Sequence, residues 1–233
     1  MRGHVVIVTG AAGNVGAAAC RLVAAQGGRV VAVDRAPDRL GAVVAALPGE
    51  GHVVEAGVDL GSAEAAASLV ARVLARSGRL DGLIHTVGGF RAAPLADADD
   101  ALWEMMFAVN LKTTLNMIRA AAAPMRAAGN GAIAVIAAGA ALKAPAGLAA
   151  YASSKSAVMR LVESAADELK GEGVRVNSVL PGTIDTPQNR AAMPDADPSK
   201  WVGVDEVASV LAFLVSPAAS GVTGAAIPIN GRG

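Results

Sequence analysis

The stretch Val5-Val6-Ile7-Val8-Thr9-Gly10-Ala11-Ala12-Gly13-Asn14-Val15-Gly16 decides the fold of this chain. Its first four residues form a continuous β-branched run, which is typical of a central parallel strand that is buried on both faces. Three glycines follow, and after them comes a helical pattern that extends to about Gln26. The stretch therefore predicts a strand, a tight turn and a helix in direct succession.

The three glycines have different tasks in such a turn. Gly10 permits the tight turn, Gly13 lets the backbone approach a pyrophosphate, and Gly16 allows close packing of helix on strand. The start of the helix offers free N–H groups and a positive dipole end to phosphate. Because the glycines lie between a strand and a helix, we predict a dinucleotide-binding loop that contains Thr9, Gly10, Gly13, Asn14, Val15 and Gly16.

A carboxylate closes the next predicted strand, Arg29–Val33. Asp34 follows Gly16 by 18 residues and Gly10 by 24, at the tip of the neighbouring strand. An acid there accepts hydrogen bonds from an adenosine ribose and repels a 2′-phosphate. NAD is therefore favoured over NADP, but Arg35 could hold a 2′-phosphate, and Asp34 could instead be an ordinary turn residue.

Strand and helix patterns alternate along the whole chain, with short connections. Further strands are expected at 52–56, 83–87, 132–137, 174–180 and 225–229, and helices at 62–77, 99–128, 150–170 and 204–215. Pro124 should bend or interrupt the long helix at 99–128. This alternation predicts the α/β class: a single doubly wound parallel sheet of the Rossmann type. We expect one domain over residues 1–233, with helices on both faces of seven strands in the order 3-2-1-4-5-6-7.

Composition excludes several classes of partner. The 233 residues are 53% hydrophobic, and 20 basic residues balance 20 acidic ones, so neither a nucleic acid nor a membrane surface is expected as a partner. No apolar run is long enough to span a bilayer, and we expect no leader segment. One cysteine, Cys20, fits a reducing compartment and suggests a cytoplasmic protein. The three scattered histidines predict no metal site.

Tyr151-Ala152-Ser153-Ser154-Lys155 contains the only tyrosine of the chain. On a helix, Tyr151 and Lys155 share one face, although such a pair also occurs by chance. A neighbouring ammonium favours the phenolate, so the pKa of the phenol is expected to fall from ~10 toward neutral pH. The pair is a candidate proton donor and its helper.

These motifs together resemble the short-chain dehydrogenase/reductase family over essentially the whole chain. Asp59 and Leu60 stand where family members contact adenine, Gly88 and Gly89 stand in the turn that follows a central strand, and Asn110 matches an asparagine that anchors a proton-relay water. Tyr151 and Lys155 match the catalytic pair. Pro181, Gly182, Thr183, Ile184 and Thr186 match the segment that binds the nicotinamide carboxamide. The resemblance implies that Tyr151, Lys155 and Asn110 are catalytic and that the other residues bind the cofactor.

Two departures narrow the resemblance. Ordinary members carry a serine about 13 residues before the tyrosine, where this chain has Ala138, and their second loop glycine comes one place later than Gly13. Both features resemble the dihydropteridine reductase branch, as do Gly88-Gly89-Phe90 and Leu180–Pro187 with the residues up to Trp201. That branch implies an NADH-dependent dimeric reductase of a quinonoid dihydropterin.

The electronic structure of a conjugated substrate would explain why the serine is missing. Loss of one donor at a developing oxyanion costs on the order of 10²–10³ in rate, but a quinonoid ring spreads the incoming electrons over several atoms. A conjugated small-molecule substrate is therefore favoured. The alternatives are a general ketone or alcohol oxidoreductase and a non-catalytic dinucleotide sensor.

The segment Pro187–Trp201 contains three prolines and is expected to be a lid over the substrate. Trp201, Met193 or Phe90 would line its apolar wall, unless Trp201 and Met193 only pack the loop down. Alanine-rich faces at 99–128 and 150–170 predict self-association, as a homodimer or a homotetramer.

Overall fold

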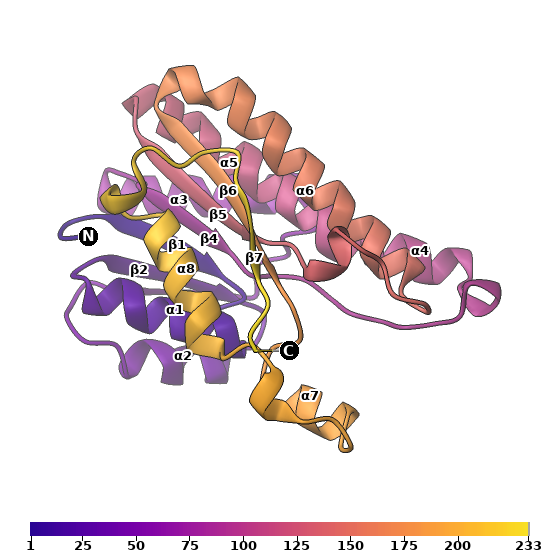
Figure 1. Ribbon diagram of the computed structural model, residues 1–233. Coiled ribbons are helices and arrows are strands. Elements are labelled where there is room, and N and C mark those ends of the chain that lie inside the picture. Colours follow the sequence, from indigo (N-terminus) through magenta and orange to yellow (C-terminus); the bar gives the residue numbers. More distant parts are fainter. Residues whose placement is uncertain (233) are drawn as a thin grey trace.

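The computed structural model describes residues 1–232 and contains one seven-stranded parallel sheet (Figure 1). The strand order is β3-β2-β1-β4-β5-β6-β7, as predicted. The strands are β1 (Val5–Thr9), β2 (Arg29–Asp34), β3 (Val53–Ala56), β4 (Gly82–His85), β5 (Gly131–Ile136), β6 (Val174–Pro181) and β7 (Ala226–Ile229). The predicted α/β class and doubly wound topology are therefore confirmed.

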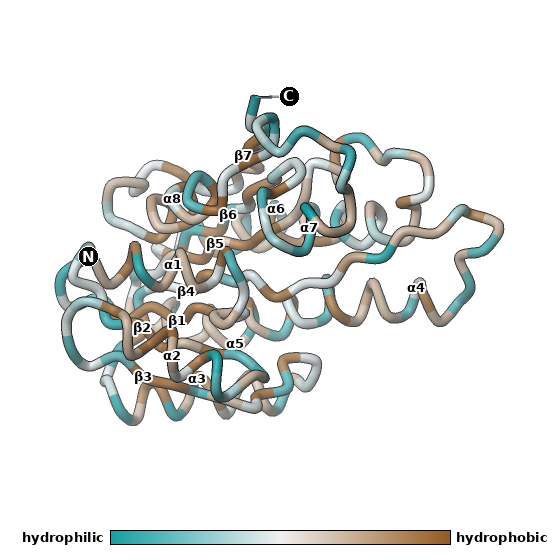
Figure 2. The backbone as a smooth tube through the Cα atoms, turned by 90° about the horizontal axis from the view of Figure 1, so that it is seen from below, coloured by the Kyte–Doolittle hydropathy of each residue, from teal (hydrophilic) through white to brown (hydrophobic). Residues whose placement is uncertain are grey.

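Helices cover both faces of the sheet. One face carries α1 (Asn14–Ala25), α2 (Pro37–Ala45) and α8 (Val204–Leu214), and the other carries α3 (Ala63–Ser77), α5 (Thr113–Ala128) and α6 (Ala149–Leu169). Side chains of a strand alternate between faces, so Val6 and Val8 pack under α1 and α8 while Val5 and Ile7 pack under α3 and α5. Figure 2 shows the hydrophobic strands enclosed between these two layers.

The helix that was predicted at 99–128 is interrupted, but not at Pro124. It consists of α4 (Asp100–Met106), a π-helical turn (Phe107–Lys112) and α5, which runs through Pro124. The wider turn leaves carbonyls without their usual partners, and two hydroxyls bond them. Thr113 donates to the Val109 carbonyl at 2.7 Å, and Thr114 donates to the Asn110 carbonyl at 2.6 Å.

Two further elements differ from the sequence prediction. Helix α2 was not predicted, although Leu40, Val43 and Val44 recur at helical spacing and pack against the core. The expected lid loop contains α7 (Pro187–Ala192) and a 3₁₀ turn (Pro198–Lys200). Thr186 caps α7, since its hydroxyl accepts a hydrogen bond from the Asn189 N–H at 3.1 Å.

The carboxyl ends of the strands meet at one edge of the sheet because all pairs are parallel. The segments that follow β1, β2, β4, β5 and β6 therefore converge there, which is where open α/β sheets bind ligands. No helix within residues 1–232 is long and apolar enough to cross a membrane.

Glycine substitutions test the packing of α1 on β1. A Cβ added to Gly16 would lie 2.1 Å from the Gly10 carbonyl oxygen, so we expect Gly16→Ala to lower the free energy of unfolding by about 1–3 kcal/mol. Gly41, inside α2, has nothing within 4 Å of an added Cβ. Gly41→Ala should instead raise stability by about 0.5–1 kcal/mol. Urea unfolding measures both, and equal effects would contradict the packing argument.

Candidate functional site

A cavity of about 1240 Å³ opens at the carboxyl edge of the sheet. Pockets for single drug-sized ligands usually measure about 300–1,000 Å³, so this one has room for a large ligand and a small one. The predicted residues that line it are Gly10, Gly13, Asn14, Val15, Gly16, Asp34, Arg35, Asp59, Leu60, Gly88, Gly89, Tyr151, Lys155, Pro181, Gly182, Thr183, Ile184 and Thr186. Residues up to 176 positions apart in sequence are thus brought together.

The glycine turn is held in a conformation that only glycine adopts easily. Gly10 has φ +68°, and a Cβ there would lie 2.5 Å from the Thr86 hydroxyl oxygen. That hydroxyl donates to the Thr9 carbonyl at 2.8 Å, which ties the turn to the end of β4. Helix α1 then begins at Gly13 without a side-chain cap or an acidic residue in its first turn. Its first N–H groups are therefore suited to an anion.

Asp34 joins the glycine turn to the second strand. Its Oδ2 accepts from the Ala12 N–H at 3.0 Å and its Oδ1 accepts from the Ala36 N–H at 3.2 Å. An ionised carboxylate has about four acceptor positions, so two remain for a ribose diol. Arg35 and Asp59 line the same end of the cavity.

Thr9 lies outside the cavity lining, unlike the other predicted cofactor residues. Its side chain is buried, and its hydroxyl is 2.8 Å from Nδ1 of His85, a residue that the sequence interpretation did not assign to the site. Nε2 of His85 is 3.4 Å from the Thr113 hydroxyl. Burial lowers the pKa of His85 to about 3, and the charge of Lys155 adds to this shift. His85 is therefore a neutral link between the end of β1 and the start of α5.

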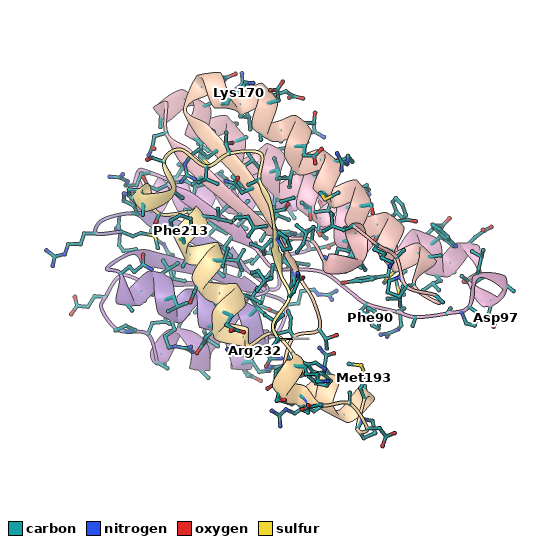
Figure 3. All side chains as sticks on the ribbon, in the orientation of Figure 1. Phe90, Asp97, Lys170, Met193, Phe213 and Arg232 are labelled. Carbon is teal, nitrogen blue, oxygen red and sulfur yellow. The ribbon has the colours of Figure 1, made fainter. Side chains whose placement is uncertain are left out.

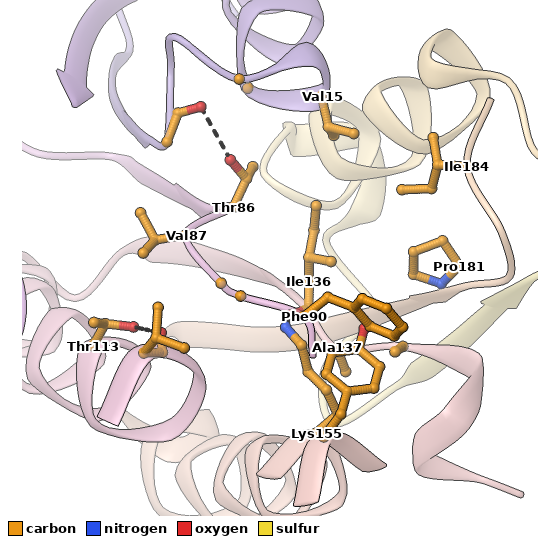
Figure 4. Close-up of a pocket in the computed structure, with 18 of the residues that line it drawn as sticks. Val15, Thr86, Val87, Phe90, Thr113, Ile136, Ala137, Lys155, Pro181 and Ile184 are labelled. Atoms are coloured by element: carbon orange, nitrogen blue, oxygen red, sulfur yellow. Dashed lines mark hydrogen bonds between the residues drawn. The ribbon is translucent and has the colours of Figure 1, made fainter. Parts of the chain in front are cut away.

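Tyr151 and Lys155 lie on one face of α6, as predicted, but the pKa of the phenol moves the other way. Burial raises the pKa of Tyr151 to about 12 and lowers the pKa of Lys155 to about 8. The Lys155 ammonium donates to the Ile136 carbonyl at 3.0 Å, and Figure 4 shows this side chain rising into the pocket beside Phe90. The charge of Lys155 was expected to lower the pKa of Tyr151, but burial has the larger effect on this pKa and cannot be read from the spacing of the two residues.

Asn110 fastens the turn after β4 to α6. Its Oδ1 accepts from the Gly89 N–H at 2.9 Å, and its amide nitrogen donates to the Gly89 carbonyl at 3.1 Å and to the Ser154 hydroxyl at 2.9 Å. Ser154 in turn donates to the Tyr151 carbonyl at 2.7 Å. The side chain of Asn110 is therefore a clamp between two parts of the site. That it also orders a water stays a prediction.

Apolar side chains surround the remaining part of the cavity, next to Tyr151. Phe90 meets the Tyr151 ring edge-on, with centroids 4.9 Å apart, and Met193, just after α7, and Ala138 also line this space. Figure 3 shows Phe90 and Met193 at the same end of the molecule. Trp201 lies outside the cavity lining, so of the two expected lid residues only Met193 faces it. We call this part, lined by Phe90, Met105, Ala138, Leu148 and Met193, the apolar half.

A hydrogen bond joins the lid segment to the glycine turn. The Asn14 side-chain amide donates to Oε1 of Gln188 at 2.9 Å, which connects α7 to the first residue of α1. Arg190 is paired with Asp185, so its charge is directed away from the cavity and onto its own segment. Within residues 1–232, no group of three or more His, Cys, Asp or Glu side chains could hold a metal ion.

Comparisons with known proteins agree with this geometry. The sequence profile of the short chain dehydrogenase family matches residues 4–197. The chain is 35% identical to a cis-4-hydroxycyclohexanecarboxylate dehydrogenase of Sinomonas cyclohexanicum, over 98% of this chain and 95% of that protein. It is 34% identical to a D-threitol dehydrogenase of Mycolicibacterium smegmatis, over 98% and 92%. A solved structure of NAD⁺-bound xylitol dehydrogenase superposes with a TM-score of 0.89 at 26% identity, over 99% and 98%.

The buried His85 predicts a dependence of stability on pH. The pKa of His85 is lowered to about 3 in the folded chain. Below pH 6.5, His85 therefore binds a proton in the unfolded chain but stays neutral in the folded chain. The free energy of unfolding should therefore fall as pH drops from 6.5 toward 3, by about 2 kcal/mol at pH 5 from this group. His85→Gln should remove that part of the slope in urea unfolding between pH 7 and 5.

The matched control for this slope is His52→Gln, at a half-buried position just before β3. It removes a histidine that is not bonded to His85 and should leave the His85 part of the slope in place. A His85→Gln variant with the full wild-type slope would contradict a neutral His85.

Proposed function

Since the chain belongs to the short chain dehydrogenase family, we propose that it is a nicotinamide-dependent oxidoreductase in which Tyr151 is the proton donor. The observation that carries this proposal is one shared cavity. Tyr151 and Lys155 line it together with the glycine turn and the residues that follow β6. A cofactor bound along the turn would therefore extend to the phenol.

The residues of the cavity suit a dinucleotide. The uncapped start of α1 would hold the pyrophosphate, Asp34 the adenosine ribose, Asp59 and Leu60 the adenine, and Gly182 to Thr186 the carboxamide. The related xylitol dehydrogenase was solved with NAD⁺. We favour NAD over NADP because Asp34 would repel a 2′-phosphate, with Arg35 as the one group at that end that could attract it.

The raised pKa of Tyr151 fits its proposed role. A bound nicotinamide supplies or accepts a hydride, and the protein must supply the accompanying proton. A phenol with a pKa of about 12 holds its proton at neutral pH, as a donor must, but its transfer then depends on stabilisation of the phenolate that forms. The ammonium of Lys155 stabilises the phenolate as it forms, in a buried site where that attraction is strong. Asn110 and Ser154 fix the backbone on either side of the pair.

We further propose a conjugated substrate, such as a quinonoid dihydropteridine, because Ala138 offers no hydroxyl beside Tyr151. Ala138 is buried and lines the cavity. A ketone would lack its second hydrogen-bond donor there, whereas a conjugated ring depends less on it. The broader alternative is a ketone or alcohol oxidoreductase, and the names of the two relatives, a cyclic hydroxy acid dehydrogenase and a polyol dehydrogenase, support that alternative.

Residues 1–233 would act as one domain in this reaction. Self-association through the helices at 99–128 and 150–170, as a dimer or a tetramer, stays a prediction.

Removal of the phenolic hydroxyl tests the assignment of the proton donor. Tyr151→Phe should lower turnover by about 10²–10⁴-fold, because the proton then has no positioned donor. NADH binding, measured by fluorescence titration, should stay within about twofold, and NADPH should bind more weakly to both proteins. The assays follow NADH oxidation with quinonoid dihydropterins, quinones and ketones.

Three results would contradict this proposal. Unchanged turnover of Tyr151→Phe would exclude this residue as the donor. Tighter binding of NADPH would overturn the cofactor preference. Tight NADH binding without turnover of any substrate would favour a dinucleotide sensor.

A serine placed back at position 138 tests the substrate class. Ala138→Ser should raise turnover of simple ketones by up to about 10²-fold, because a hydroxyl would then face the developing oxyanion. Ala140→Ser is the matched control, since Ala140 lines the same cavity two residues further along the chain. It should change ketone turnover little. If neither serine helps, the shape of the cavity rather than the missing donor limits ketone reduction.

A further inference from the structure

The segment between β5 and α6 contains a single charged side chain. From Ala137 to Ala150 every residue is Ala, Gly, Leu or Pro, except Lys143. Helix formation does not explain one lysine in the middle of this apolar run, because the segment forms only a short 3₁₀ turn at Gly139–Ala141. The position of Lys143 relative to the cavity therefore decides what this side chain can bind.

Lys143 lines the cavity, beside the apolar half. Its neighbours Gly139 and Ala140 line the cavity before it, and Pro145 and Leu148 line it after it. No ion pair within residues 1–232 involves Lys143, whereas Lys170, just after the far end of α6, is paired with Asp167. The ammonium is therefore free to meet a charged ligand.

The backbone around Lys143 is fixed on both sides. The Ser156 hydroxyl donates to the Ala141 carbonyl at 3.0 Å, and the Leu142 N–H donates to the Gly139 carbonyl at 3.0 Å. On the other side, the Ala93 N–H donates to the Gly147 carbonyl at 2.9 Å. The lysine side chain thus begins from a constrained position at the rim of the cavity.

The other charged lining residues either lie at the end of the cavity that we assign to adenosine or already have a hydrogen-bond partner. Asp34, Arg35 and Asp59 line the end that we assign to adenosine. Lys155 is buried and bonded to the Ile136 carbonyl. Among the described lining residues, no carboxylate accompanies Phe90, Met105 and Met193 in the apolar half. Among the described lining residues, Lys143 is therefore the charged side chain that remains for a ligand in this half.

We propose that Lys143 is a specificity-determining residue that binds a carboxylate group of the substrate. This inference rests on the broader form of the proposed function, a ketone or alcohol oxidoreductase, because Tyr151 marks the end at which a carbonyl would react and a quinonoid dihydropterin ring carries no carboxylate. The substrate class is then a small, largely apolar ring or chain with the reacting carbonyl at one end and a carboxylate at the other. Because Lys143 is exposed to solvent, we expect a gain in affinity of only about five- to tenfold.

The test uses binding rather than turnover. Calorimetry on the NAD⁺-saturated protein compares cyclohexanecarboxylate with the isosteric neutral cyclohexanecarboxamide at low salt. We expect the carboxylate to bind about five- to tenfold more tightly, and this preference to shrink at high salt. Lys143→Met should abolish the preference and Lys143→Arg should keep it. Lys170→Met removes a distant charge (Figure 3) and should leave it unchanged.

A second measurement separates binding from chemistry. With NADH and 4-oxocyclohexanecarboxylate, Lys143→Met should raise KM about fivefold and leave kcat unchanged, while KM for 4-methylcyclohexanone stays as in the wild type.

Equal affinity for the two calorimetric probes, failure of both to bind, or a preference that survives Lys143→Met would overturn the role of Lys143. Absence of turnover with every substrate would overturn the proposed function alone, because the binding comparison needs no reaction.

Discussion

The contact between the backbone of Gly16 and the carbonyl of Gly10 sets the geometry of the ligand-binding edge. A side chain at position 16 would collide with that carbonyl, so only glycine lets α1 begin this close to the end of β1. The uncapped helix start then lies beside Asp34, which bonds the intervening Ala12. The groups that we propose for phosphate and ribose are thus placed by one close approach, and Thr86 holds the turn from the neighbouring strand.

A second constraint places the chemistry. The π-helical turn brings the amide of Asn110 to Gly89 on one side and to Ser154 on the other. Since Ser154 lies between Tyr151 and Lys155 in α6, this clamp holds the turn after β4 against the proposed catalytic pair. Gly88 has no room for a side chain here, because an added Cβ would lie 2.8 Å from Asn110 Oδ1 and 3.0 Å from Lys155 Nζ.

Burial, more than charge, controls the ionisable groups of the site. It holds His85 neutral, keeps the proton on Tyr151 and brings the pKa of Lys155 to about 8. Such shifts are typical of functional sites, where proton transfer requires groups away from their ordinary ionisation. Among the described lining residues, Lys143 is the charged group beside the apolar half. The proposed carboxylate of the substrate is based on this charge.

The sequence by itself determined the fold class and the glycine turn, because strand periodicity and glycine spacing are local properties of the chain. The alternation of strands and helices indicated the strand order. Many of the residues at the cavity followed from the resemblance to a known family. It also identified Tyr151, Lys155 and Asn110, although their roles stay proposals. Only the tertiary structure decided that Thr9 bonds His85 and that Asn110 joins Gly89 to Ser154. It also decided that the long helix is interrupted at Phe107–Lys112 and that the pKa of Tyr151 rises. Each of these depends on contacts between segments far apart in sequence, and on the burial that those contacts create.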